Sequence, residues 1–167
     1  MAIFIENHYI GNKNIGRKMY KIESYEYKKH DPKKKIIVYG AALYGEVVIN
    51  ALENVGLKCD LLCDRVQAGG EFCGCRVISP AELLKYRDAE ILICATKGFE
   101  GIYTFLTENG FENIFEISKL LEHINYDKLR PYCRQLGREE LAEKYLFYLK
   151  DHDNGESSLD LSFVALS

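Results

Sequence analysis

Short apolar runs alternate with stretches of helical periodicity between residues 35 and 117, and this alternation constrains the fold more than any other feature. Each apolar run is short and rich in Val, Ile and Leu, which predicts a buried strand. Strands that alternate with helices are typical of a parallel sheet covered by helices on both faces. We therefore predict an α/β fold with three layers (αβα), a mainly parallel five-stranded sheet and a helical C-terminal appendage. The predicted strands span residues 35–40, 57–64, 75–78, 89–96 and 113–117.

Residues typical of helix ends separate these strands. Gly56 and Gly110 each follow a run of helical periodicity, at the position where a left-handed residue ends a helix. Ser79 is the predicted N-cap of a further helix, with Pro80 as its first residue and Glu82 completing a capping box. The helices are therefore predicted over 42–55, 79–86 and 99–110.

The flanking segments differ in pattern from this unit, which we predict to be a nucleotide-binding domain over 35–117. Residues 1–34 are predicted to form an N-terminal extension and residues 118–151 the helical appendage. Residues 152–167 are predicted to form a polar linker and the start of a further strand or domain. The last nine residues, LDLSFVALS, begin an apolar alternation that stops with the chain. This favours either a fragment of a longer protein or a terminal strand at the sheet edge.

Charge and hydropathy exclude several classes of protein. The net charge of the 167-residue chain is −3, yet residues 1–39 carry nine Lys or Arg against four Asp or Glu. We interpret this basic lead as a solvated flank, and not as a nucleic-acid or membrane-surface patch, because aromatic residues are not interleaved with it as in RNA-binding sheets. No apolar run approaches the roughly 20 residues of a membrane-spanning helix, and no signal peptide is recognisable. A cytoplasmic location is therefore predicted.

The six cysteines do not predict a metal site. The pair in Cys73-Gly74-Cys75 lacks a second pair or a histidine cluster in register, whereas a structural zinc site needs four ligands. In a cytoplasmic protein these thiols are expected to be free. Cys59, Cys63 and Cys94 lie on predicted strands, where they are expected to act as small buried apolar residues.

The first predicted strand ends in a glycine loop that opens a helix. The loop has the pattern G-x-A-x-x-G, one position away from the dinucleotide-binding pattern G-x-G-x-x-G. It consists of Gly40, Ala41, Ala42, Leu43, Tyr44 and Gly45. Gly40 is expected to permit the tight turn and Gly45 to let the helix approach the sheet closely. Ala42 stands where a glycine normally admits a pyrophosphate, although the helix N–H groups still favour an anion. The loop thus predicts a phosphate-containing ligand, and the alternative is that its glycines only shape a turn.

Two other strand ends supply candidate ligand contacts. Asp64 ends the second strand, 24 residues after the first loop glycine, near where an acid hydrogen-bonds ribose hydroxyls. Arg65 beside it is suited to a phosphate. The fourth strand ends at Ala95, Thr96 and Lys97, at the edge where open α/β sheets bind ligands. Thr96 is expected either to donate to a phosphate or ribose, or to cap the next helix.

Residues 34–117, about half the chain, resemble the small Rossmann-like nucleotide-sugar-binding domains of bacterial surface-polysaccharide and sugar-modifying enzymes. The similarity lies in GAxxxG after the first strand, Asp after the second, a G-x-x-V-x-x-P hook over residues 74–80, and an Ala-rich end to the fourth strand. The resemblance implies that Gly40, Ala41, Gly45 and Asp64 contact a nucleotide-sugar. It does not imply the acetyltransferase activity of some such enzymes, because their hexapeptide repeats are absent. Separately, LDLSFVALS resembles the strand that precedes the cysteine loop of radical S-adenosylmethionine enzymes, whose cysteine motif is missing here.

These features together predict a binding module for a nucleotide, a nucleotide-sugar or a dinucleotide such as NAD(P). The module would be an accessory domain of a sugar- or polysaccharide-modifying enzyme, with a catalytic domain covalently linked downstream. One alternative is a small NAD(P)-dependent oxidoreductase. Another is a degenerate Rossmann-like interaction domain that forms a homodimer through the helical appendage and precedes a radical S-adenosylmethionine domain. No Ser/His/Asp arrangement is readable, so no catalytic residue is assigned.

Overall fold

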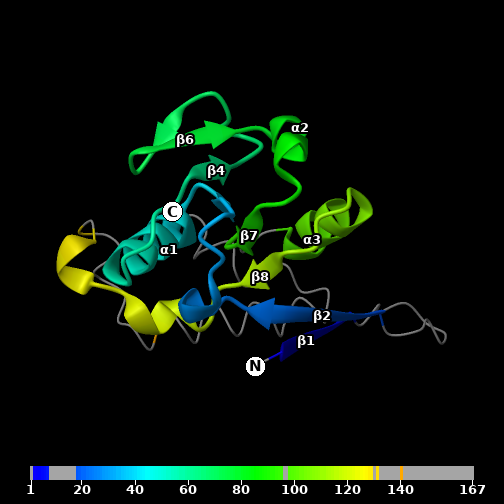
Figure 1. Ribbon diagram of the computed structural model, residues 1–167, viewed down its shortest axis with the longest axis horizontal. Helices are drawn as coiled ribbons and strands as arrows, with labels where there is room; N and C mark the ends of the chain where they lie inside the picture. The colour runs from blue at the N-terminus through cyan, green and yellow to red at the C-terminus, as the bar shows by residue number, and fades with distance from the viewer. Residues whose placement is uncertain (1, 8–17, 96–97, 130, 132–139, 141–167) are drawn as a thin grey trace.

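The computed structural model describes residues 2–7, 18–95, 98–129, 131 and 140 of the chain, and these form an α/β fold. The described strands form a sheet with the order β1-β2-β8-β7-β3-β4-β6-β5 (Figure 1). Their bounds are β1 Ala2–Asn7, β2 Lys18–Ser24, β3 Ile36–Tyr39, β4 Leu61–Cys63, β5 Glu71–Phe72, β6 Cys75–Ile78, β7 Glu90–Ile93 and β8 Ile114–Glu116. The α-helices are α1 Leu43–Asn54, α2 Pro80–Leu83 and α3 Phe99–Glu108. Single 3₁₀ turns lie at Tyr27–Lys29, Leu84–Tyr86, Leu120–His123 and Tyr126–Lys128.

The five strands predicted from the sequence are confirmed as β3, β4, β6, β7 and β8, and they pair in parallel. β3 and β7 lie next to each other at the centre, and all four residues of each are buried. Unbroken apolar runs such as IIVY form central strands because both faces of a parallel sheet are covered by helices. The helix ends predicted at Gly56 and Gly110 are also confirmed, since both glycines have positive φ, +81° and +82°.

The predicted count of five strands is too low, because three further strands extend the described sheet. β2 pairs in parallel with β8, and β1 pairs antiparallel with β2, so residues assigned to an N-terminal extension belong to the sheet. The third, β5, lies between the predicted strands 57–64 and 75–78 and forms a hairpin with β6. Its turn residues Cys73 and Gly74 have φ of +48° and +78°, as two-residue hairpin turns require.

Helices cover both faces of the sheet. Figure 1 shows α1 on one side of the strands, and α2 and α3 on the other. Residues after β8, predicted to begin a helical appendage, form 3₁₀ turns that pack against α1. Asn50 of α1 fixes this contact, since its side chain donates to the Asn125 carbonyl (3.0 Å) and accepts from the Asn125 N–H (2.8 Å). Beyond residue 129 the predicted helical appendage is described only at residues 131 and 140, and the segment 152–167 lies outside the described residues.

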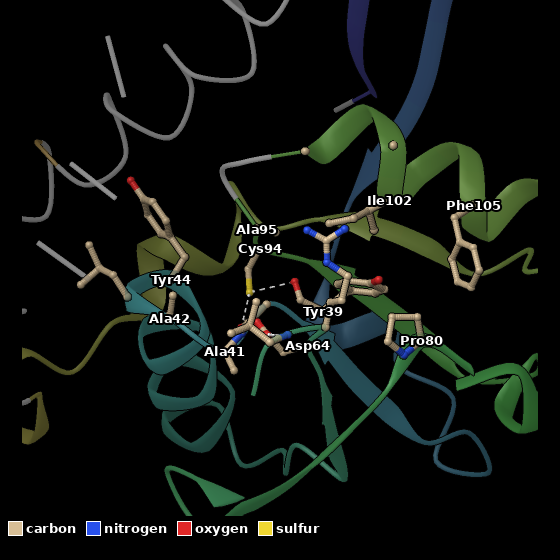
Figure 2. Close-up of a pocket in the computed structure, with 16 residues that line it drawn as sticks. Tyr39, Ala41, Ala42, Tyr44, Asp64, Pro80, Cys94, Ala95, Ile102 and Phe105 are labelled. Carbon is tan, nitrogen blue, oxygen red and sulfur yellow. Dashed lines mark hydrogen bonds between the residues drawn. The ribbon is translucent and has the colours of Figure 1, made fainter. Parts of the chain in front are cut away.

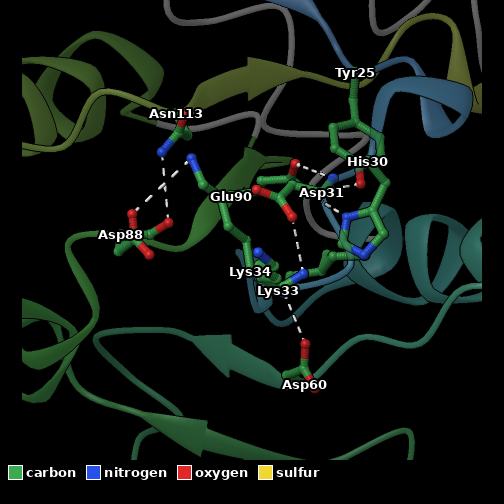
Figure 3. A network of polar contacts seen from close by, with 10 residues as sticks. Tyr25, His30, Asp31, Lys33, Lys34, Asp60, Asp88, Glu90 and Asn113 are labelled. Carbon is green, nitrogen blue, oxygen red and sulfur yellow. Dashed lines mark hydrogen bonds and ion pairs between the residues drawn. The ribbon is translucent and has the colours of Figure 1, made fainter.

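A buried carboxylate, Glu90, ties the segment after β2 to the start of β7 (Figure 3). Its Oε2 accepts from the Tyr25 hydroxyl at 2.9 Å and lies 2.6 Å from His30 Nδ1, while Oε1 accepts from the Asp31 N–H at 3.2 Å. Burial of the phenol, reinforced by the charge of Glu90, raises the pKa of Tyr25 well above its usual value. Residues 25–31 are therefore anchored to the sheet, whereas the sequence was interpreted as placing them in a solvated flank.

Candidate functional site

A cavity of about 810 Å³ opens at the carboxyl ends of β3, β4 and β7 (Figure 2). From β3 the chain proceeds to β4 on one side and later to β7 on the other side. The connections therefore diverge at β3, and in open α/β sheets such a point leaves a crevice between the loops. The lining residues come from the end of β3 and the glycine loop, the turn after β4, the end of β7, the start of α2 and the first two turns of α3. They are Tyr39, Gly40, Ala41, Ala42, Leu43, Tyr44, Asp64, Arg65, Val66, Pro80, Cys94, Ala95, Gly98, Gly101, Ile102 and Phe105.

Both loop glycines are required by close backbone contacts. Gly40 has φ +127°, and a Cβ there would lie 3.0 Å from the Ala95 N atom, so the turn after β3 presses against the end of β7. A Cβ on Gly45 would lie 2.3 Å from the Gly40 carbonyl oxygen. The expectation that Gly45 lets α1 approach the sheet closely is therefore confirmed, and Gly45 does not line the cavity.

Ala42, which replaces the middle glycine of the dinucleotide pattern, is the N-cap residue of α1 and is exposed toward the cavity. Its φ of −141° is ordinary extended backbone, so this position does not require glycine. The Ala42 side chain makes no capping hydrogen bond, because a methyl group cannot accept one. The first turn of α1 consequently faces the cavity without a side-chain cap from this position.

The Asp64 carboxylate is largely occupied by the protein's own backbone. Oδ2 accepts from the buried Ala41 N–H at 3.0 Å, and Oδ1 accepts from the N–H groups of Val66 (2.8 Å) and Gln67 (3.0 Å). The Gln67 side chain in turn donates to the Ala41 carbonyl at 2.7 Å. Since a carboxylate offers about four acceptor positions, one position remains for a ligand. Asp64 thus fastens the glycine loop to the turn after β4, a role that the sequence did not indicate.

The floor of the cavity between β3 and β7 consists of protonated side chains. The Cys94 thiol donates to the carbonyls of Tyr39 and Gly40, both at 3.3 Å. Burial raises the pKa of Cys94 well above its usual value, and burial together with neighbouring Cys63 raises that of Tyr39. Cys94 is therefore a neutral thiol at physiological pH and does not act as a thiolate nucleophile.

The side of the cavity opposite the glycine loop is apolar. Figure 2 shows Ile102 and Phe105 of α3 and Pro80 of α2 across the cavity from Ala41 and Ala42. Pro80 is held in place by the predicted cap, because Ser79 Oγ accepts from the Glu82 N–H at 3.1 Å. The exposed residues Arg65 and Val66 form the rim. The cavity therefore has a backbone-rich end at α1 and an apolar end at α2 and α3.

Most of the predicted ligand contacts lie together at this cavity. Those that line it are Gly40, Ala41, Ala42, Leu43, Tyr44, Asp64, Arg65 and Ala95. Thr96 and Lys97 lie outside the described residues. Sequence reasoning missed the contributions of Tyr39, Cys94, Ile102 and Phe105. Ile102 and Phe105 lie on the apolar face of α3, and the sequence pattern by itself assigns such a face to the core.

Comparison with protein-family models, with curated proteins and with solved structures found no match for this chain. In the part of the chain that the structure describes, no helix combines the length and the apolar character needed to cross a membrane.

Proposed function

We propose that this chain is a Rossmann-like module that binds a nucleotide, a nucleotide-sugar or a dinucleotide, as an accessory domain of a sugar- or polysaccharide-modifying enzyme. The observation that carries the proposal is the position of the cavity at the point where the connections around β3 diverge. Open α/β sheets bind their ligands at such points, outside the carboxyl ends of the strands. A volume of about 810 Å³ lies within the usual range for small-molecule sites.

The phosphate of the ligand is proposed to lie at the N-terminus of α1, beside Ala42. A helix N-terminus carries partial positive charge and N–H groups directed at an anion. The loop approaches this point through Gly40, whose lack of a side chain brings the backbone close to β7. The Ala42 methyl group narrows the approach relative to glycine, which favours a terminal or sugar-linked phosphate over a deeply inserted pyrophosphate.

The base or sugar is proposed to extend toward the apolar end formed by Pro80, Ile102 and Phe105. Planar rings gain burial and stacking energy against such side chains. Asp64 has one acceptor position left beyond its three backbone bonds, which suits a single ligand hydroxyl. Arg65 at the rim is positioned to meet a second phosphate or a carboxylate of the ligand.

Isothermal titration calorimetry of the full chain tests this proposal with UDP-N-acetylglucosamine, NADH and S-adenosylmethionine. We expect saturable binding of at least one nucleotide ligand at micromolar to millimolar concentration. Binding of NADH alone would favour the oxidoreductase alternative. If none of the three binds at millimolar concentration, the proposal is refuted and the interaction-domain alternative is favoured.

A pair of variants at Ala42 separates phosphate binding from folding. Ala42→Asp introduces a favourable N-cap, so the protein should remain folded, but it places a negative charge where the phosphate is expected. Like charges at an interface cost several kcal/mol, so affinity should fall by about tenfold or more. Ala42→Asn is the matched neutral cap, and it should retain affinity within a few-fold. Equal affinities of the two variants would show that the phosphate does not lie at α1.

A further inference from the structure

Two cysteines meet at the amino ends of neighbouring strands, on the edge of the sheet opposite the cavity. β4 and β6 pair in parallel, with Leu62 beside Val77. Continuing this register by two residues brings Cys75 beside the residue that follows Cys59. With strands about 4.8 Å apart and a rise of about 3.3 Å per residue, ideal geometry would place the two Cα atoms about 6 Å apart. Disulfides span Cα separations of about 4.4–6.8 Å.

Their side chains are buried in the same place. Cys59 is 2% exposed and Cys75 8% exposed, and both are free thiols. The Cys75 sulfur lies 3.5 Å from the carbonyl oxygen of Cys59, to which it donates. The Cys59 sulfur donates to the Leu61 carbonyl at 3.1 Å, which turns it along the start of β4. The two thiols also lie close enough to influence each other's ionisation.

The contact between the two thiols shifts their pKa values in opposite directions. Cys59 lowers the pKa of Cys75, although burial opposes this shift. The same contact raises the pKa of Cys59, and burial adds to the effect. A thiolate is the nucleophile in disulfide exchange, and Cys75 is the more exposed of the two cysteines, at 8% against 2%. An oxidant therefore reaches Cys75 first, which makes it the attacking group and Cys59 the resolving one. By contrast, burial raises the pKa of Cys63 to about 12, which leaves it unreactive.

We propose that Cys59 and Cys75 form a reversible dithiol–disulfide site that is oxidised by a low-molecular-weight disulfide. The Cys75 thiolate attacks one sulfur of the oxidant, forming a mixed disulfide and releasing one thiolate. Cys59 then loses its proton and attacks the Cys75 sulfur, forming the Cys59–Cys75 bond and releasing the second thiolate. The protein dithiol loses two electrons and two protons in total, and the oxidant becomes two thiols.

The disulfide would close a loop over residues 60–74, which carries Asp64 and the rim residues Arg65 and Val66. It would also brace β5 and its hairpin turn to the start of β4. The proposal rests on the contacts of the two cysteines and is independent of the ligand proposed for the cavity.

Cysteine mapping of the folded full-length chain tests the proposal. The protein is incubated with excess oxidised glutathione, remaining thiols are alkylated, and the chain is cleaved before its aspartate residues. This cleavage places Cys59 and Cys63 on different peptides, and fragment-ion sequencing distinguishes Cys73 from Cys75. We expect a Cys59–Cys75 linkage with a mass loss of about two units, one per hydrogen atom removed, and its complete reversal by dithiothreitol. The far-ultraviolet circular dichroism spectrum should remain unchanged.

Two variants test which cysteines form the linkage. Cys73→Ala, at the exposed hairpin turn, is the matched control and should retain the linkage, whereas Cys59→Ala should lose it and accumulate a glutathione adduct on Cys75. The proposal is overturned if both cysteines of the wild-type chain remain alkylatable under oxidation. It is equally overturned if the linkage joins another pair, or forms only after the protein is unfolded.

Discussion

The contacts of Asp64 predict that this residue stabilises the fold, whatever ligand the cavity accepts. Replacement of Asp64 by Ala removes three hydrogen bonds from backbone N–H groups. The Ala41 N–H is buried and would lose its acceptor, which costs about 1–3 kcal/mol. The N–H groups of Val66 and Gln67 belong to exposed residues, where water replaces the carboxylate at little cost. We therefore expect Asp64→Ala to lower the free energy of unfolding by about 1–3 kcal/mol.

Asp64→Asn is the more discriminating substitution, because its size is unchanged. The side-chain oxygen of the new asparagine can still accept from the N–H groups of Val66 and Gln67. Its NH₂ group then faces the Ala41 N–H, so that two hydrogen-bond donors point at each other. The loss should be at least about 1 kcal/mol, the cost of an unpaired buried donor. Urea unfolding followed by circular dichroism measures both changes. The dependence of the unfolding free energy on urea concentration should be unaltered.

Asp88→Asn is the control, because the Asp88 side chain is 89% exposed and its carboxylate lies 4.0 Å from the Lys34 ammonium. It should change the free energy of unfolding by less than about 0.5 kcal/mol. Should Asp64→Ala also remain within about 0.5 kcal/mol of the wild type, the structural role assigned to Asp64 is wrong. A loss of ligand affinity with unchanged stability would instead restore the role predicted from the sequence, in which Asp64 holds a ribose.

Four further predictions concern Gly45, Tyr25 and Glu90. Gly45→Ala should destabilise the protein by about 3 kcal/mol, because the new Cβ would lie 2.3 Å from the Gly40 oxygen. Gly101 is likewise the third residue of its helix, but a Cβ there would meet open space, so Gly101→Ala should stabilise the protein by about 0.5 kcal/mol. Equal changes in melting temperature for the two variants would refute the packing argument. Tyr25→Phe should cost about 1.5–3 kcal/mol in urea unfolding through the lost bond to Glu90, and an unchanged midpoint would count against that bond. Because the pKa of Tyr25 is raised in the folded state, the contribution of Tyr25 to stability is complete below about pH 10. Above that pH the contribution is lost by about 1.4 kcal/mol per pH unit. Tyr25→Phe should therefore flatten the decline of stability with alkaline pH, and an identical decline in both proteins would contradict this assignment. Glu90→Gln should destabilise the protein in the same assay, since three donors lose a charged acceptor, and should lower the stability by more than Tyr25→Phe does.

Local features of the sequence were sufficient wherever a residue acts through its own backbone. Ser79 caps α2 because its hydroxyl reaches the N–H three residues ahead, and this depends on no distant contact. Gly56 and Gly110 end their helices because a left-handed residue is accessible to glycine at little cost. The five central strands were readable because both faces of a parallel sheet are apolar. For the same reason the loop residues Gly40–Tyr44 and Asp64 were placed at one edge of the sheet.

Strands at the periphery were not readable in this way. β2 contains two lysines and a glutamate, and a short run with such residues resembles a solvated flank. Its place is set by the pairing of Glu23 and Ser24 with the end of β8, more than 90 residues away in the chain. Glu90 lies in the predicted strand 89–96, and only the return of residues 25–31 gives its carboxylate three donors.

The sequence by itself determined the βαβ order, the helix ends and the edge at which the glycine loop and Asp64 lie. These features follow from periodicity and backbone preference, which act over a few residues. Only the tertiary structure decided what Asp64 binds, which helix faces close the apolar end of the cavity and which cysteines meet. Each of these depends on the approach of segments distant in the chain, because side-chain hydrogen bonds and thiol contacts exist only within about 3–4 Å.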